Sequence, residues 1–353
     1  MSIIDLIALV VVIGFLGVIV YVANQEETQT EPSARGAPAL NVMLYAIIGL
    51  TLLFALLTLQ TGVFSVLGPS GALDDVGLPA VDAAAAVVNF GLAVIAGFFA
   101  VRLINSAALR ARLKQVTGPD STYNPESAVH TAAAVLSLAL LSFSIGQLVL
   151  SGGLAGLAES FELQQIDAAS VLFNQLLWVL FALLGVGLFI RRNPAQTLER
   201  LGLRWPTRED ITWGIGTALA LFAFIYVLGI IWALLVTPEQ FAEQTAASQQ
   251  IAQSFGSLPV AFVLALAIGF GEEVFFRGAL QPVFGLGLTS VFFALLHTQY
   301  TLTPATIAIF VVSVGLGRLR ARHSTTAAVI AHFLYNFIQL ALAILATSVL
   351  GGQ

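Results

Sequence analysis

Three ionisable side chains lie inside one of the most apolar stretches of this sequence. Glu272, Glu273 and Arg277 fall within the run GFGEEVFFRGAL, which has hydrophobic residues on both sides. Burying such groups in a segment that otherwise resembles a membrane span is costly, so they mark a functional site with partners elsewhere in the chain. Glu273 and Arg277, four positions apart with the acid first, are expected to form an ion pair. Glu272 is then left without a partner on its own helix.

Two later apolar segments supply the expected partners. Phe293 and His297 stand four positions apart in FFALLH, and His332 and Asn336 stand four apart in AHFLYN. This spacing places both members of a pair on one face of a helix. Three successive hydrophobic segments are therefore expected to present polar groups to a shared interior, with Phe293 contributing packing.

These side chains could hydrolyse an amide bond without a nucleophilic side chain. Glu272 is the candidate general base that takes a proton from water, and His297 could orient the same water. His332 and Asn336 offer an imidazole N–H and an amide NH2, which are donor types that stabilise an oxyanion. The predicted chemistry is direct attack of activated water on a peptide carbonyl.

The composition sets the class of protein. Of the 353 residues, 58% are hydrophobic and 9% are charged, whereas a soluble domain has about 25% charged residues. Apolar runs of about 20 residues, the length that crosses a bilayer as a helix, recur along the sequence. We therefore predict an all-α, polytopic membrane bundle of about ten transmembrane helices. The absence of cysteine excludes disulfides, thiolate metal sites and a cysteine nucleophile.

The predicted helices divide among three regions. Residues 1–128 hold accessory N-terminal helices with a flexible linker, residues 129–209 hold intermediate helices and a basic loop, and residues 210–350 carry the polar motifs. The first apolar run lacks a basic n-region, so we expect a retained helix rather than a cleaved signal. The predicted spans are 3–23, 39–62, 79–106, 129–151, 168–190, 211–236, 258–283, 286–299, 303–318 and 325–349.

The basic residues predict an orientation, because Lys and Arg in short loops tend to stay on the cytoplasmic side. Most of the 14 Lys and Arg residues fall in three loops that share one side of the ten-helix arrangement. Glu272 and His297 lie symmetrically about the turn-like run PVFGLG, each about 19 Å from it along a helix. A hairpin at that point would bring both to the same depth. His332 lies about 14 Å from its preceding turn, which allows all three to meet in the cytoplasmic half of the bundle.

The motifs E-E-x-x-x-R, F-x-x-x-H and H-x-x-x-N, in this order on consecutive hydrophobic helices, resemble those of a known family. It is the CPBP family of intramembrane endopeptidases, also called the Abi group, which includes CAAX prenyl proteases and bacteriocin-processing proteins. The resemblance covers roughly residues 210–345, so the region 210–350 would be a protease core of this type. Its substrates are membrane-associated peptides or proteins, prenylated in some members.

The family's site residues can be carried over position by position. The resemblance implies that Glu272 and His297 activate the hydrolytic water, and that His332 and Asn336 are the oxyanion donors. We expect no cofactor, with zinc as the alternative. The two residues that it places in support of the site are Glu273 and Arg277.

Three other functions fit part of the pattern. A zinc-dependent peptidase could use His297, His332 and Glu272 as ligands, with water in the fourth position, although the sequence has no H-E-x-x-H motif. A transporter also places Glu, His and Arg within the membrane, but we see no internal repeat in this chain. A non-catalytic immunity protein could keep the same fold without turnover.

The expected partners are the lipid bilayer and a membrane-associated peptide or protein substrate, with or without a lipid group. No nucleic-acid partner is expected. The expected location is the plasma or inner membrane, where the protein would be an integral, multi-pass component with its site facing the cytoplasmic side.

Overall fold

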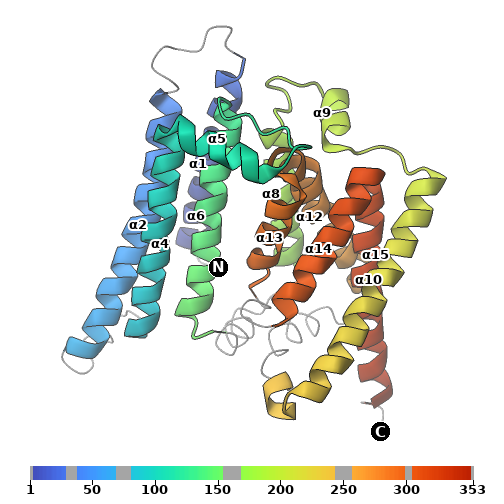
Figure 1. Cartoon of the computed structure of the whole chain (residues 1–353). Coiled ribbons are helices and arrows are strands. Elements are labelled where there is room, and N and C mark those ends of the chain that lie inside the picture. Colours follow the sequence, from blue (N-terminus) through green and yellow to red (C-terminus); the bar gives the residue numbers. More distant parts are fainter. Residues whose placement is uncertain are drawn as a thin grey trace. The chain divides into compact units, whose positions relative to one another are not determined.

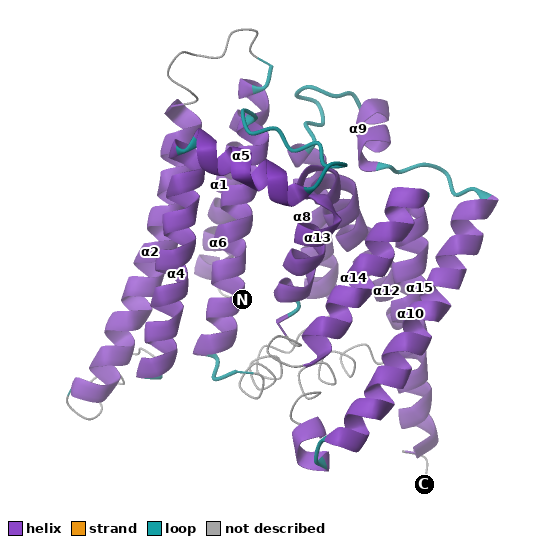
Figure 2. Cartoon of the chain, viewed as in Figure 1, coloured by secondary structure: helices purple, strands orange, loops and turns teal. Residues whose placement is uncertain are grey.

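The computed structural model describes residues 3–28, 38–68, 81–153, 168–242, 257–298 and 304–350 (Figure 1). Within these ranges the chain is helical, apart from turns, loops and one isolated bridge between Leu188 and Arg192 (Figure 2). The predicted all-α class is confirmed. The helices are α1 (Ile3–Glu26), α2 (Pro38–Leu67), α4 (Ala83–Asn105), α5 (Ala107–Thr117), α6 (Ala128–Leu150), α8 (Ala168–Gly185), α9 (Pro194–Leu201), α10 (Arg208–Leu235), α12 (Leu258–Glu272), the π-helix η1 (Glu273–Leu280), α13 (Gln281–Leu296), α14 (Pro304–Arg322) and α15 (Thr325–Leu350).

Eight stretches of helix in the described ranges are long and apolar enough to cross a membrane. One of them, Leu258–Leu296, contains α12, η1 and α13, but its backbone leaves the helical conformation at Gly285, where φ is 75° and ψ is 169°. The sequence prediction divides this stretch into two spans and adds α14, which is not among the eight. The polytopic membrane bundle is confirmed, and the difference in the count comes from these two places.

The helices fall into two compact units. Unit 1 comprises residues 1–146 and 180–200, and unit 2 comprises residues 147–179 and 201–353. This division crosses the predicted middle region 129–209 and passes through α8. The linker predicted after the first helix lies mainly in residues 29–37, outside the described ranges. All residues of the three polar motifs belong to unit 2.

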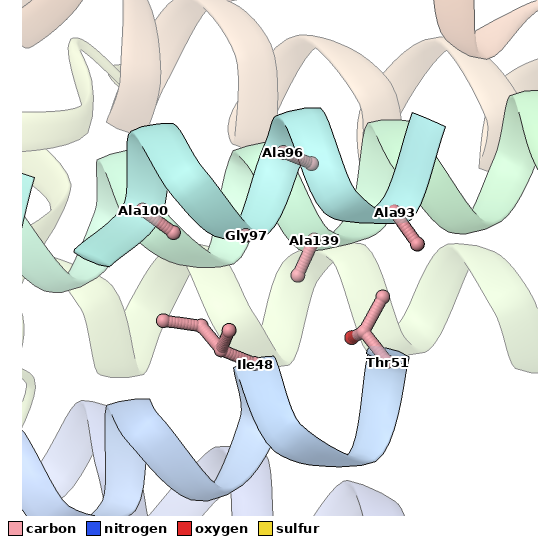
Figure 3. A pocket seen from close by; sticks show the side chains of 7 residues that line it. All are labelled: Ile48, Thr51, Ala93, Ala96, Gly97, Ala100 and Ala139. Atoms are coloured by element: carbon pink, nitrogen blue, oxygen red, sulfur yellow. The ribbon is translucent and has the colours of Figure 1, made fainter. Parts of the chain in front are cut away.

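Small residues allow close packing in unit 1. Helices α2 and α4 pack side by side (Figure 1), and Figure 3 shows where their facing side chains and one from α6 enclose a cavity of about 10 Å³. Small side chains let helix backbones approach closely in membranes. A cavity this small with an apolar surface offers no polar group that would hold a ligand. The lining residues are Ile48, Thr51, Ala93, Ala96, Gly97, Ala100 and Ala139.

Two basic segments that the sequence assigned to loops contain short helices, α5 and α9. Ser106 ends α4 and caps α5, because its side-chain oxygen accepts a hydrogen bond from the Leu109 backbone N–H at 3.2 Å. Arg110 donates to the carbonyl oxygens of Leu103 at 2.9 Å and Ile104 at 3.0 Å. A cation that binds the exposed carbonyls at a helix C-terminus is stabilising, so Arg110 fixes the corner between α4 and α5.

In unit 2, glycines let two neighbouring segments approach α12 and η1, which carry the two glutamates. A Cβ at Gly269 would lie 2.8 Å from the backbone nitrogen of Phe333 in α15. A Cβ at Gly278 would lie 3.0 Å from the carbonyl oxygen of Leu201. Helix α15 also packs against α10 and α14, and α13 packs against α14 (Figure 1). The absence of side chains at these glycines therefore brings the backbones that carry the motifs close together.

The start of α15 is tied to the start of α10 by a buried carboxylate. Thr207 and Asp210 form a reciprocal capping box at the N-terminus of α10. Asp210 is fully buried, accepts a hydrogen bond from the Ser324 hydroxyl at 2.7 Å and forms an ion pair with Arg204 at 3.0 Å. Thr325 donates to the Leu201 carbonyl oxygen at 2.6 Å. These contacts fix where α15, and so its two motif residues, enters the unit.

The π-helical turn in η1 was not predicted. It begins at Glu273, and at its end the backbone N–H of Gln281 reaches back five residues to the carbonyl oxygen of Phe276. Beyond it, the Gln281 amide donates to the Gly317 carbonyl oxygen at 2.9 Å, so η1 and the start of α13 run alongside α14. Short π-helical segments are frequent at functional sites, and this one directly follows Glu272.

Candidate active site

The reversal at Gly285 brings Glu272 and His297 together. These residues are 25 positions apart, which would separate them by about 38 Å in one continuous helix. In the structure Glu272 Oε2 lies 3.8 Å from His297 Nε2. The hairpin geometry expected from the sequence is therefore present, and the end of α13 returns to the depth of the glutamates.

The orientation of the His297 ring follows from its other nitrogen. His297 Nδ1 lies 2.8 Å from the Phe293 carbonyl oxygen, and because a carbonyl can only accept, Nδ1 must carry the proton. A neutral His297 ring therefore presents an unprotonated Nε2 to the Glu272 carboxylate. Two acceptors at 3.8 Å do not bond to each other, but a water could donate one proton to each. The side chains of His297 and Glu272 are 19% and 12% exposed, so the pair lies at the edge of the buried region.

Glu273 is the centre of a second, more deeply buried cluster. Its side chain is fully buried, with Oε2 lying 3.2 Å from Arg277 Nε and Oε1 lying 2.8 Å from His332 Nδ1. Arg277 is 1% exposed and donates from Nη2 to the Ser313 hydroxyl at 3.2 Å and to its carbonyl oxygen at 3.3 Å. The ion pair expected between Glu273 and Arg277 is present. The carboxylate that meets His332 is Glu273, whereas the sequence predicted a cluster of His332 with Glu272 and His297.

Asn336 lies one helical turn beyond His332 on α15 and is half-buried. Among the residues that the structure describes, its side chain makes no hydrogen bond. His332 uses Nδ1 for Glu273, which leaves Nε2 as the ring nitrogen available to another group. The structure thus brings Glu272 to His297, and Glu273 to both Arg277 and His332, while Asn336 remains a neighbour of His332 along one helix.

Helix α8 supplies contacts that the sequence did not connect with the site. The Trp178 ring lies 4.5 Å from the Phe275 ring, measured between centroids. Gln175 is 8% exposed, and its Oε1 lies 2.6 Å from where a Cβ at Gly271 would stand. No donor in the described ranges reaches that oxygen. In the sequence, the glycine at position 271 was the feature that could have indicated this close approach.

The arrangement has the parts of a water-activating site. A carboxylate and an imidazole nitrogen face each other on two antiparallel helices, and a carboxylate-bound imidazole and a primary amide lie on a third. Among the described residues, no group of three or more His, Asp or Glu side chains could hold a metal ion.

Comparison with known proteins points to one family. A family profile described as type II CAAX prenyl endopeptidase, Rce1-like, matches residues 254–338, a segment that contains all seven residues of the three motifs. The resemblance to the CPBP family is confirmed for this part of the chain, which is less than half of its length. No solved structure matches the chain.

A protein of Bacillus subtilis (strain 168), described as uncharacterized protein YpbD, is 31% identical over 126 residues. The matched region covers 35% of this chain and 61% of that protein. The chain therefore spans less than two thirds of this relative, and the relative's description assigns no activity.

Proposed function

We propose that this protein is an intramembrane endopeptidase that hydrolyses a peptide bond of a membrane-associated peptide or protein. The observation that carries the proposal is the 3.8 Å separation of Glu272 Oε2 and His297 Nε2, with the His297 proton held at Nδ1 by the Phe293 carbonyl. Both facing atoms are acceptors, so a water between them is oriented by two hydrogen bonds with its oxygen free to attack. The match to the prenyl endopeptidase family over residues 254–338 supports the same chemistry.

In the proposed reaction the water oxygen attacks the scissile carbonyl carbon while Glu272 takes one of the water protons. The carbonyl oxygen becomes an oxyanion. When the carbon–nitrogen bond breaks, Glu272 returns the proton to the leaving amine nitrogen, so no side chain is modified. The π-turn that follows Glu272 and the hairpin at Gly285 set the distance between base and imidazole.

His332 and Asn336 are the proposed oxyanion donors. His332 Nδ1 is bound to Glu273, so a donor at Nε2 requires the doubly protonated ring, whose charge Glu273 offsets. With Arg277 also charged, the three groups carry one net positive charge, the sign that stabilises an oxyanion in a site of low dielectric constant. Glu273 and Arg277 therefore support the donors electrostatically as well as by packing.

The basic end of unit 2 supports a site that opens toward the cytoplasm. Arg204 precedes α10 and Arg208 begins it, and both are exposed. Arg322 ends α14. The contacts of Leu201 with Gly278 and of Gly202 with Thr325 place this basic segment beside the end of η1 and the start of α15. Because basic loops tend to stay on the cytoplasmic side, we propose that this end faces the cytoplasm. The proposed location is the plasma or inner membrane.

The test compares the purified wild type with Glu272→Gln in liposomes, using a library of membrane-anchored fluorogenic peptides with and without a C-terminal prenyl group. Loss of the general base is expected to lower kcat by about 10²- to 10⁴-fold. Glu209→Gln, at an exposed glutamate of α10, is the matched control and should keep wild-type turnover. Undiminished turnover by Glu272→Gln would remove the proposed base. Inhibition by a chelator that zinc reverses would instead favour a zinc peptidase.

A further inference from the structure

Phe293 is the side chain that lies against both carboxylate–imidazole clusters. It is 2% exposed. Its ring centroid lies 4.3 Å from that of His297, with the planes inclined by 35°, and 4.4 Å from Arg277 Cζ. His332 also approaches, at 6.2 Å between ring centroids and 62° between planes. One phenyl ring is therefore in contact with a member of the water-activating pair and with members of the Glu273 cluster.

These contacts have a physical consequence beyond filling space. The face of a phenyl ring carries partial negative charge, so a guanidinium within about 6 Å of the centroid is attracted to it. Arg277 lies well inside that distance, and its Nη1 has no hydrogen-bond partner among the described residues. The aromatic ring thus supplies an interaction for a buried cation that ion pairing alone leaves incompletely satisfied.

The same residue also holds His297 in two ways. Its backbone carbonyl fixes the proton at Nδ1, and its ring lies against the imidazole plane. Rotation of the imidazole about its side-chain bonds would break both contacts, so they keep Nε2 directed toward Glu272. A leucine at position 293 would fill a similar volume and keep the carbonyl, but it would lose the interactions of the aromatic ring.

We infer that Phe293 is a positioning residue for the water-activating pair, acting through the electrostatics of its ring and not through its volume alone. The ring couples the orientation of His297 to the buried Arg277, so the two clusters are held in one arrangement. This inference rests on the proposed function, in which His297 and Glu272 bind the water. Phe293 itself touches neither the water nor the scissile bond.

The test replaces Phe293 with phenylalanine analogues that carry an increasing number of ring fluorines, which weaken and then reverse the charge of the ring face at nearly constant shape. The expected result is a stepwise fall in kcat, reaching about 2- to 30-fold for the pentafluoro ring, the range of a cation–π interaction. KM should stay close to the wild-type value, because Phe293 does not contact substrate. Phe292 is the matched control: it packs in the same aromatic cluster, and fluorination there should leave kcat unchanged.

A wild-type kcat with pentafluorophenylalanine at position 293 would overturn the inference and leave Phe293 a packing residue. An equal fall at positions 292 and 293 would overturn it as well. A second measurement does not depend on turnover. Pentafluorophenylalanine at position 293 should lower the thermal unfolding midpoint in the wild-type background and lower it less in Arg277→Met. If the wild type cleaves no peptide, the proposed function fails, while this coupling still decides whether the ring interacts with Arg277.

Discussion

The two adjacent glutamates should respond differently to the same substitution. Glu273 is fully buried and is bound by Arg277 and His332. Glu273→Gln leaves the Arg277 guanidinium, itself 1% exposed, without a counter-charge in the interior. Breaking a buried pair in this way costs about 3–5 kcal/mol. Glu272 Oε2 has no hydrogen-bond partner in the described ranges, so Glu272→Gln breaks no bond and removes a half-buried charge. Its stability should stay within about 1 kcal/mol of the wild type.

Unfolding in mixed detergent micelles, followed by tryptophan emission, can measure this difference. Trp178 packs directly on Phe275 in η1, so its emission reports on the helix that carries both glutamates. A double-mutant cycle with Arg277→Met isolates the ion pair. The double variant Glu273→Gln with Arg277→Met should be less destabilised than the sum of the single variants, because neither buried charge is then left alone. Equal destabilisation by Glu272→Gln and Glu273→Gln, or strict additivity in the cycle, would refute this account of the cluster.

Three further substitutions have definite expected outcomes. Asn336→Ala should lower kcat by about 10²- to 10³-fold, as for loss of one oxyanion donor, with an unchanged unfolding midpoint; a kcat within twofold of wild type would argue against that role. Gly271→Ala should destabilise the protein by about 1–3 kcal/mol, because its Cβ would meet Gln175 Oε1 at 2.6 Å. Gly287→Ala, where nothing lies within 4 Å, is the control and should not destabilise. Asp210→Ala should cost about 1–3 kcal/mol, because the Ser324 hydroxyl and the α10 cap lose their acceptor; unchanged denaturant unfolding would show that this link is dispensable.

The sequence predicted which positions along neighbouring helices come together better than it predicted which way the side chains face. The rise per residue of a helix is fixed, so the equal spacing of Glu272 and His297 about Gly285 was enough to predict a hairpin that brings them together. The acid-first spacing of Glu273 and Arg277 likewise predicted their ion pair. Both predictions depend only on positions within one or two neighbouring helices.

The pairing of His332 with Glu273 could not be predicted in the same way. Adjacent helix residues point about 100° apart, so the choice between Glu272 and Glu273 depends on how α15 is rotated about its axis. That rotation is set by contacts far away in the sequence, such as Ser324 with Asp210 and Phe333 with Gly269. The π-turn at η1 changes the direction of the side chains again. Spacing within a motif contains none of this information.

The division of α8 between the two units limits how far the chain can be shortened. The residues of α8 up to 179 belong to unit 2, which carries the glutamates. The residues of α8 from 180 onward belong to unit 1. A truncated protein that starts at residue 201 would retain every polar motif but would lose Trp178 and Gln175. Lipid acyl chains would then fill the space that Gln175 occupies beside Gly271. They provide no aromatic ring to pack on Phe275 and have no fixed conformation. A shortened protein should therefore begin before α8, even though the family match begins at residue 254, 86 residues after the start of α8.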